Sequence, residues 1–155
     1  MRQDQRPPLS SLLVIENSDE DFETLSRIIN RVSTVSIFVH RCIDGDDALD
    51  FLNRVGEYSN IDDLLTPGLI ILDLNLPGTD GREVLIALKQ SQTLKTIPVV
   101  VLSTSSNPKD IAACYQSGVN SYMLKPMNIN ALKDSVQILL DYWFKITVLP
   151  ASVTQ

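Results

Sequence analysis

The sequence has little of what secreted, membrane-spanning or metal-binding proteins depend on. Its 155 residues include two cysteines, Cys42 and Cys114, which lie far apart and match no metal-binding spacing. Both stand in apolar surroundings, so we expect buried free thiols. No apolar run approaches the roughly 18 residues that span a bilayer, and residues 1–9 lack the apolar stretch of a signal peptide. These absences favour a cytoplasmic protein.

Positive charge is also scarce. The chain has 13 lysines and arginines against 19 aspartates and glutamates, which gives a formal net charge of −6. No basic run is long enough for a nucleic-acid patch, and a net negative charge disfavours contact with DNA and with anionic lipids. We therefore expect neither a nucleic-acid partner nor a membrane partner.

Short apolar segments alternate with amphipathic segments five times along the chain. The apolar segments, of strand length, cover residues 11–15, 35–42, 69–72, 98–102 and 121–124. The segments with helical periodicity are 18–32, 46–55, one that begins at 82, 107–117 and 129–140. This alternation predicts an α/β protein of the (βα)5 type. Its doubly wound sheet would have five parallel strands, right-handed crossovers and helices on both faces.

One domain is expected from this length. Residues 1–9 are polar and contain prolines, which favours a flexible N-terminal arm. Residues 10–144 form the domain, and residues 145–155 are an apolar tail. The large apolar side chains around the start of this tail are those of Trp143, Phe144, Val148 and Leu149. Such a tail packs on its own domain or on a partner, and the sequence favours neither.

The stretch 69–81 is the most informative part of the sequence. Residues 69–72 are all apolar, as in a strand buried on both faces, and Asp73 follows where this strand leaves the core. Pro77, Gly78 and Gly81 then turn the chain. Because ligands of open α/β sheets bind at the carboxyl ends of the strands, Asp73 is the candidate reactive group.

Other polar side chains follow the predicted strands at the same edge of the sheet. They are Glu16 and Asn17 after the first strand, Asn75 after the third, Ser103 after the fourth and Lys125 after the fifth. Oxygen ligands suit Mg²⁺, the serine offers a hydroxyl donor, and the lysine adds a fixed positive charge. An aspartate in these surroundings is well placed to carry a phosphoryl group as an acyl phosphate.

Each of these residues also has an ordinary structural explanation. An aspartate after a strand is often a turn former, and a lysine before a proline is often solvated. Glu16 and Asn17 could be helix-entry residues, and we assign the acidic residues 19–21 to stabilisation of the helix dipole. The joint occurrence, with such residues at the ends of the first, third, fourth and fifth strands, is what favours a single site.

Together these motifs resemble the receiver domains of bacterial two-component response regulators, over residues 12–140. Asp73 matches the phosphoacceptor, within the motif at 72–81. Ser103 and Lys125, which lie 30 and 52 residues further on, match the family's hydroxyl and lysine. The resemblance implies the flavodoxin-like strand order 2-1-3-4-5.

The resemblance also implies Mg²⁺ as cofactor. Its ligands would be Glu16, Asn17, Asp73 and the main-chain carbonyl of Asn75. The family usually ends its first strand with two acidic residues, and Asn17 stands in place of the second. An amide oxygen can coordinate Mg²⁺ but brings no charge, so we expect weaker metal binding.

Further positions match family roles in switching. Tyr122 matches the aromatic residue that turns inward on phosphorylation, and Asn75 and Ser105 match positions that tune dephosphorylation. The implied protein is a phosphoacceptor switch that assists its own phosphorylation and dephosphorylation, and is not otherwise an enzyme.

Within the family, the segments 56–58, 74–78 and 142–150 look like those of single-domain regulators that partner cyanobacterial phytochromes. That group implies a sensor histidine kinase, a phytochrome, as the phosphodonor. It also implies a homodimer through the fourth helix, the fifth strand and the fifth helix, with Trp143, Phe144, Val148 and Leu149 as interface residues.

Two other classes of protein are alternatives. Asn17 favours a pseudo-receiver, a scaffold with weak or absent phosphorylation. An enzyme or a flavin carrier on a similar sheet fits less well. The run 73–75 lacks the second acid of a dehalogenase-type phosphohydrolase. The turn at 16–19 has neither the glycines of a dinucleotide site nor the hydroxyl-rich loop of a flavodoxin.

Overall fold

A computed structural model of the protein describes residues 10–61 and 66–150. The strands are β1 (Ser10–Ile15), β2 (Ile37–Cys42), β3 (Leu69–Leu72), β4 (Val99–Ser103) and β5 (Ser121–Leu124). The helices are α1 (Asp19–Val32), α2 (Gly45–Asn53), α3 (Gly81–Gln90), α4 (Pro108–Gln116) and α5 (Ile129–Asp141), with a 3-10 turn η1 (Gly56–Tyr58) and a π-helical turn η2 (Tyr142–Ile146). The predicted arm at 1–9 and the end of the tail, 151–155, lie outside the described residues.

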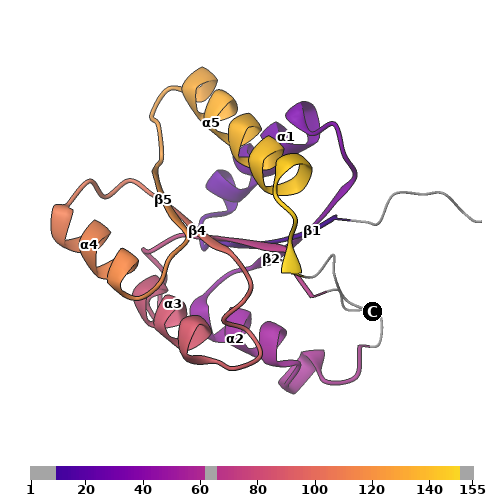
Figure 1. Ribbon diagram of the computed structural model, residues 1–155, viewed down its shortest axis with the longest axis vertical. Helices are drawn as coiled ribbons and strands as arrows, with labels where there is room; N and C mark the ends of the chain where they lie inside the picture. The colour runs from indigo at the N-terminus through magenta and orange to yellow at the C-terminus, as the bar shows by residue number, and fades with distance from the viewer. Residues whose placement is uncertain (1–9, 62–65, 151–155) are drawn as a thin grey trace, which may run out of the picture.

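The five strands form one parallel sheet in the order β2-β1-β3-β4-β5, which confirms the predicted fold and strand order (Figure 1). Helices α1 and α5 cover one face of the sheet, and α2, α3 and α4 cover the other. The three inner strands are buried on both faces, which explains why their sequences are apolar without alternation. None of the helices in the described ranges is long and apolar enough to cross a membrane.

A polar side chain caps the start of every one of these five α-helices. In each case its oxygen accepts a hydrogen bond from a main-chain N–H of the first turn. The capping residues are Ser18, Asp44, Asp80, Asn107 and Asn128. These caps fix where each helix begins after the preceding strand, and therefore fix the loops at the carboxyl edge of the sheet.

The second strand is shorter than the sequence predicts. The expected start is residue 35, but β2 begins at Ile37, which pairs with Ser10 at the start of β1. Within the described residues, 35 and 36 have no paired strand residue, although the Ser36 carbonyl accepts a hydrogen bond from the Ser10 amide at 3.3 Å. In addition, the Ser33 hydroxyl donates to the Val35 carbonyl at 2.6 Å, which draws that carbonyl into the preceding turn.

The tail folds back onto its own domain. Leu149 is only 6% exposed, whereas Val148 is 79% exposed. A Cβ placed on Gly68, just before β3, would lie 2.9 Å from Leu149 Cδ1 and 3.8 Å from Phe144 Cε1, so both side chains pack against the start of that strand. Trp143 and Phe144 are partly buried against the α1–α5 side of the core. For Leu149, the structure favours packing on its own domain over contact with a partner.

Replacing Leu149 with alanine is expected to lower the free energy of unfolding by about 2–4 kcal/mol, because the change removes buried apolar volume above Gly68. Val148→Ala is the matched control, and we expect it to change stability by less than about 0.5 kcal/mol. Urea unfolding of the two variants measures both values. Equal effects would mean that the tail does not pack on the domain in solution.

Candidate functional site

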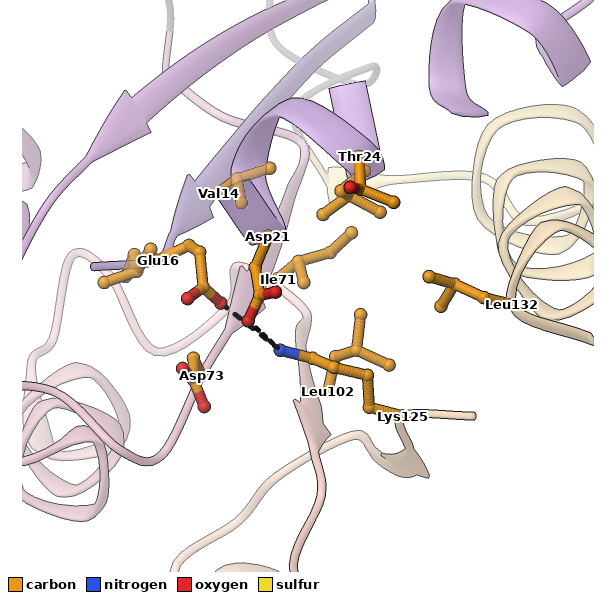
Figure 2. Close-up of a pocket in the computed structure, with 11 residues that line it drawn as sticks. Val14, Glu16, Asp21, Thr24, Ile71, Asp73, Leu102, Lys125 and Leu132 are labelled. Atoms are coloured by element: carbon orange, nitrogen blue, oxygen red, sulfur yellow. Dashed lines mark hydrogen bonds and ion pairs between the residues drawn. The ribbon is translucent and has the colours of Figure 1, made fainter. Parts of the chain in front are cut away.

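The carboxyl ends of β1, β3, β4 and β5 meet at one edge of the sheet, as predicted. The Asp73 amide donates to the Ile15 carbonyl at 3.1 Å, and the Lys125 amide donates to the Ser103 carbonyl at 2.7 Å. Figure 2 shows the carboxylates of Glu16, Asp21 and Asp73 grouped near the ammonium of Lys125. The structure therefore brings together side chains that are more than 100 residues apart in sequence.

Asp73 is half-buried directly after β3. Its Oδ1 accepts a hydrogen bond from the Asn75 amide at 3.2 Å, which turns the chain away from the strand. Asn75 itself is exposed. The Gly81 amide donates to the Leu74 carbonyl at 3.2 Å, so the start of α3 closes the loop behind Asp73.

Gly81 has no room for a side chain. A Cβ there would lie 2.6 Å from Leu74 Cα and would also collide with the Asp73 carbonyl. We expect Gly81→Ala to cost about 3 kcal/mol of stability, because the neighbours are main-chain atoms that cannot turn aside. The variant should also react more slowly with a phosphodonor, because relief of the clash displaces Asp73.

Gly118→Ala is a useful contrast to Gly81→Ala. Its φ of +98° disfavours alanine, but the nearest atoms lie in the flexible Lys89 side chain, at 3.4 Å and beyond. The expected cost is about 1–2 kcal/mol. Chemical denaturation compares the two variants, and equal losses would contradict the tight fit at Gly81.

Glu16 is a buried acid, only 6% exposed. Its Oε1 accepts a hydrogen bond from the Ser18 amide at 3.1 Å, and its Oε2 lies 3.5 Å from Lys125 Nζ. Burial raises the pKa of Glu16, and the nearby charge of Asp73 raises that pKa further. A buried carboxylate whose charge is disfavoured in this way, with a second carboxylate beside it, is a favourable setting for a cation.

Asn17 is exposed beside Glu16. Its side-chain nitrogen donates to the Ile43 carbonyl at 3.3 Å. This bond takes the nitrogen end of the amide and leaves the oxygen end, the only end that can bind a cation, available as a ligand.

Lys125 forms ion pairs with two carboxylates, Glu16 at 3.5 Å and Asp21 at 3.4 Å. Its side chain is 18% exposed. Burial alone would lower the pKa of Lys125, but the charges of Glu16, Asp73 and Asp21 outweigh burial and raise it. The lysine is therefore a permanently positive group within this edge of the sheet.

The predicted metal ligands offer only oxygen atoms. Asp73 and Glu16 provide carboxylates, Asn17 an amide oxygen, and Asn75 a main-chain carbonyl. Among the residues that the structure describes, no three His, Cys, Asp or Glu side chains gather as a metal cluster. The set fits a hard divalent cation such as Mg²⁺ better than zinc, and it has one acid fewer than a site with three carboxylates.

The predicted switch residues lie beside this group. Ser103 is completely buried at the end of β4, and its Oγ accepts a hydrogen bond from the Ser105 amide at 3.1 Å. The Tyr122 hydroxyl donates to the Ser105 carbonyl at 2.7 Å, and the ring packs against the α2–α3 side of the core. The aromatic side chain is thus already turned inward.

Ser105 takes part in a network that the sequence did not predict. Its hydroxyl donates to Asp110 Oδ2 at 2.7 Å, and Asp110 Oδ1 pairs with Arg82 at 3.0 Å. Arg82 also pairs with Asp80, the cap of α3, at 3.0 Å. The network ties the loop after β4 to the start of α3, and it directs the Ser105 hydroxyl toward Asp110.

Two more residues near the site were not recognised from the sequence. We assigned Asp21 to the helix dipole alone, yet it contacts Lys125. The helical periodicity nevertheless indicated that Asp21 faces the sheet, because it stands on the same stripe as the buried Leu25 and Ile28. The other is Arg41 in β2, for which strand periodicity gave no sign of a contact with the loop after β1.

Arg41 holds that loop by its main chain. Its Nε donates to the Glu16 carbonyl and its Nη2 to the Asn17 carbonyl, both at 3.1 Å. Its Nη1 donates to Asp19 at 2.7 Å, and the guanidinium lies 4.9 Å from the centre of the Phe22 ring. One side chain therefore fixes two of the four residues predicted to bind the metal.

Arg41→Gln is expected to lower the free energy of unfolding by about 1–3 kcal/mol, because charged hydrogen bonds to two carbonyls are lost. Arg41→Lys should restore little of this, since one ammonium cannot reproduce the forked geometry. Asp19→Asn is the control, with a loss below about 1 kcal/mol, because Asp19 is 87% exposed. Urea unfolding distinguishes the three, and full rescue by lysine would show that only charge matters.

Comparison with known proteins agrees with the geometry. Residues 12–137 match the response regulator receiver domain. The chain is 42% identical to the response regulator Rcp1 of Synechocystis sp. over 96% of this chain and 99% of that protein. It is 30% identical to the chemotaxis protein CheY of Pseudomonas aeruginosa, over 79% of this chain and 92% of that protein.

Solved structures of response regulators are also similar to this chain. The phosphorylated cyanobacterial phytochrome response regulator RcpA superimposes with a TM-score of 0.84 at 40% identity, over 91% of this chain and 98% of that chain. The Mn²⁺-bound form of Rcp1 also gives a TM-score of 0.84 at 40% identity, over 91% and 99%.

Proposed function

Because this chain belongs to the family of response regulator receiver domains, which work in phosphorelay signalling, we propose that it accepts a phosphoryl group on Asp73. A sensor histidine kinase is the donor in this proposal. The observation that supports it most directly is the grouping of Asp73, Glu16 and Lys125 at one edge of the sheet.

Each residue has a distinct role in the proposed transfer. An Asp73 oxygen attacks the phosphorus of the phosphohistidine, the bond from phosphorus to the histidine nitrogen breaks, and the nitrogen keeps the electron pair. Lys125 then neutralises one phosphoryl oxygen, and the Ser103 hydroxyl donates to another. Both groups act by placing positive charge and a donor where negative charge develops, and neither forms a bond to phosphorus.

We assign the metal position to Glu16, Asn17, Asp73 and the Asn75 carbonyl, with Mg²⁺ as the ion. When bound, Mg²⁺ supplies positive charge to the phosphoryl oxygens. The protein's own contribution is the shape of the site: Arg41 fixes the main chain of residues 16 and 17, and Ile43 orients the Asn17 amide. The relative Rcp1 has been solved in a Mn²⁺-bound form, which supports a divalent cation here.

We assign the switch to Ser103 and Tyr122. Ser103 can donate its hydroxyl hydrogen to the phosphoryl group while its oxygen still accepts from the Ser105 amide, so a movement of Ser103 toward Asp73 would carry with it the Ser105 carbonyl that accepts from Tyr122. The surface of α4, β5 and α5 then changes its preference for partners. Asn75 and Ser105 tune the lifetime of the phosphoryl group in this proposal.

The partner proposal follows from the relatives. RcpA is described as a cyanobacterial phytochrome response regulator, and AtBRR, 33% identical with a TM-score of 0.70, as a bacteriophytochrome response regulator. We assign a phytochrome-type histidine kinase in the cytoplasm as phosphodonor. Output runs through protein contacts, including a homodimer on the α4-β5-α5 face near Trp143, Phe144 and Val148, and without binding of nucleic acid.

Intact-mass measurement after incubation with acetyl phosphate tests the proposal. We expect one phosphoryl adduct that requires Mg²⁺ and fails to form in excess EDTA. Peptide mapping should place the adduct on Asp73. Absence of any adduct at millimolar Mg²⁺ would reject phosphoacceptance and leave the pseudo-receiver alternative.

A further inference from the structure

Lys125 is proposed to neutralise a phosphoryl oxygen on Asp73, yet its observed ion pairs are with other carboxylates. Its ion pairs within the described residues are with Glu16 and Asp21, at 3.5 and 3.4 Å, and none is with Asp73 (Figure 2). We propose that Asp21 is a positioning residue that holds the Lys125 ammonium in the unmodified protein and must release it when a phosphoryl group arrives. The proposal rests on the function assigned above to Asp73.

The position of Asp21 is built into the start of α1. Ser18 caps the helix and its hydroxyl accepts from the Asp21 amide at 3.2 Å, which fixes that residue in the first turn. Asp21 stands one turn before the buried Leu25, so its side chain leaves the helix on the side that faces the sheet. The pocket beneath the site is lined by Asp21, Asp73 and Lys125 together.

Asp21 and Glu16 hold the lysine in different ways. The Glu16 carboxylate is 8% exposed and lies beside Asp73, so this pair remains close to the reacting oxygen. The Asp21 carboxylate lines the same pocket but is 52% exposed, and it belongs to α1 rather than to a strand end. A phosphoryl oxygen on Asp73 can therefore draw Lys125 from Asp21 without uncovering a buried charge.

The expected effect is modest, because half-exposed ion pairs are weak. Such a pair shifts an equilibrium about two- to fivefold. Removing the Asp21 charge should therefore release Lys125 and tighten binding of a phosphoryl analogue at Asp73 by this factor. The Asp21–Lys125 pair sets how readily the resting protein accepts the phosphoryl group.

The first test measures the pair in the unmodified protein. Asp21→Asn, Lys125→Met and the double variant form a cycle of unfolding constants from urea denaturation. We expect the unfolding constants of this cycle to give a coupling factor of about two to five, where a factor of one means no interaction. Glu20→Gln with Lys125→Met is the matched control cycle, because Glu20 is the neighbouring exposed acid in the same helical turn, and its coupling should be about one. A coupling of one for Asp21 would overturn the proposal, whatever the outcome with phosphodonors.

The second test measures the consequence at Asp73. Fluorine NMR titration with beryllium fluoride and Mg²⁺ should show that Asp21→Asn binds beryllium fluoride about two- to fivefold more tightly than Glu20→Gln does. This factor is what the loss of one exposed ion pair predicts. The gain should vanish when Lys125 is methionine. A gain that survives without the lysine would mean simple charge repulsion by Asp21 and would overturn the proposal, as would equal affinities of the two variants.

The two proposals fail in different ways. If the wild-type protein bound no beryllium fluoride and formed no adduct with acetyl phosphate, the function assigned to Asp73 would be wrong. The cycle of unfolding constants would still decide whether Asp21 holds Lys125. If the wild type reacts and the variants Asp21→Asn and Glu20→Gln behave alike, only the role of Asp21 is rejected.

Discussion

Asp73→Asn is expected to abolish incorporation of a phosphoryl group from acetyl phosphate in the presence of Mg²⁺. An amide oxygen is too weak a nucleophile to form the acyl phosphate. The fold should survive, because the asparagine Oδ1 can still accept the hydrogen bond from the Asn75 amide. Intact-mass measurement gives the incorporation, and urea unfolding shows that the variant is folded.

No neighbouring acid should replace Asp73. Glu16 is buried, and its carboxylate is already engaged by the Ser18 amide and by Lys125. Asp21 pairs with the same lysine, and it belongs to α1 rather than to the end of β3. Asp50→Asn, an exposed acid on α2, is the control and should react as the wild type does. Retained labelling of the Asp73→Asn protein would place the phosphoacceptor elsewhere.

The positions of the inner strands were predictable because burial leaves a strong signal, whereas their order followed from the resemblance to receiver domains. The inner strands β1, β3 and β4 are apolar at nearly every buried position, and a polar residue ends or follows each where the chain leaves the core. The start of β2 was not predictable, because it depends on the register with Ser10 in another strand. Edge strands keep part of their surface in water, so their sequences mark their ends less sharply.

The site was predictable as far as strand ends define it. Glu16, Asp73, Ser103 and Lys125 each follow or end a strand, and parallel strands bring their carboxyl ends to one edge. The contacts made by long side chains were not predictable. Arg41 reaches across from β2 to two carbonyls of the loop after β1. Nothing in the local sequence encodes that reach, because it depends on how the two strands are aligned.

The tail shows a limit of a different kind. The sequence identified Leu149 as too apolar for a free end, but could not choose between its own domain and a partner. The choice depends on Gly68, which leaves space above the start of β3 and lies 81 residues earlier in the chain. A long-range fit of this kind has no periodicity that a sequence pattern could reveal.

Asn17 is the residue at which the site departs most from its family, and its geometry decides how the departure should act. Its amide nitrogen donates to the Ile43 carbonyl, and its main-chain carbonyl accepts from Arg41. The loop is thus held firmly in place, and what the asparagine lacks is charge. A site that is well placed but short of one negative charge should bind Mg²⁺ weakly and still react once the ion is bound.

Asn17→Asp is therefore expected to raise the affinity for Mg²⁺ by about tenfold or more. A further carboxylate attracts a divalent ion strongly, although its repulsion by Glu16 and Asp73 offsets part of the gain. Without Mg²⁺ the variant should be less stable by about 1 kcal/mol, because the donor to the Ile43 carbonyl is lost. Calorimetric titration with Mg²⁺ and urea unfolding with and without the ion measure the two effects.

Asn53→Asp is the matched control for this change. Its side-chain nitrogen also donates to a main-chain carbonyl, that of Leu49 at 2.9 Å, but it lies at the end of α2, away from the site. We expect a similar small loss of stability and unchanged Mg²⁺ affinity. If Asn17→Asp left the affinity unchanged as well, residue 17 would not be a metal ligand. If it gave tighter binding and faster phosphorylation at low Mg²⁺, the missing charge at residue 17 would be what limits the wild-type protein.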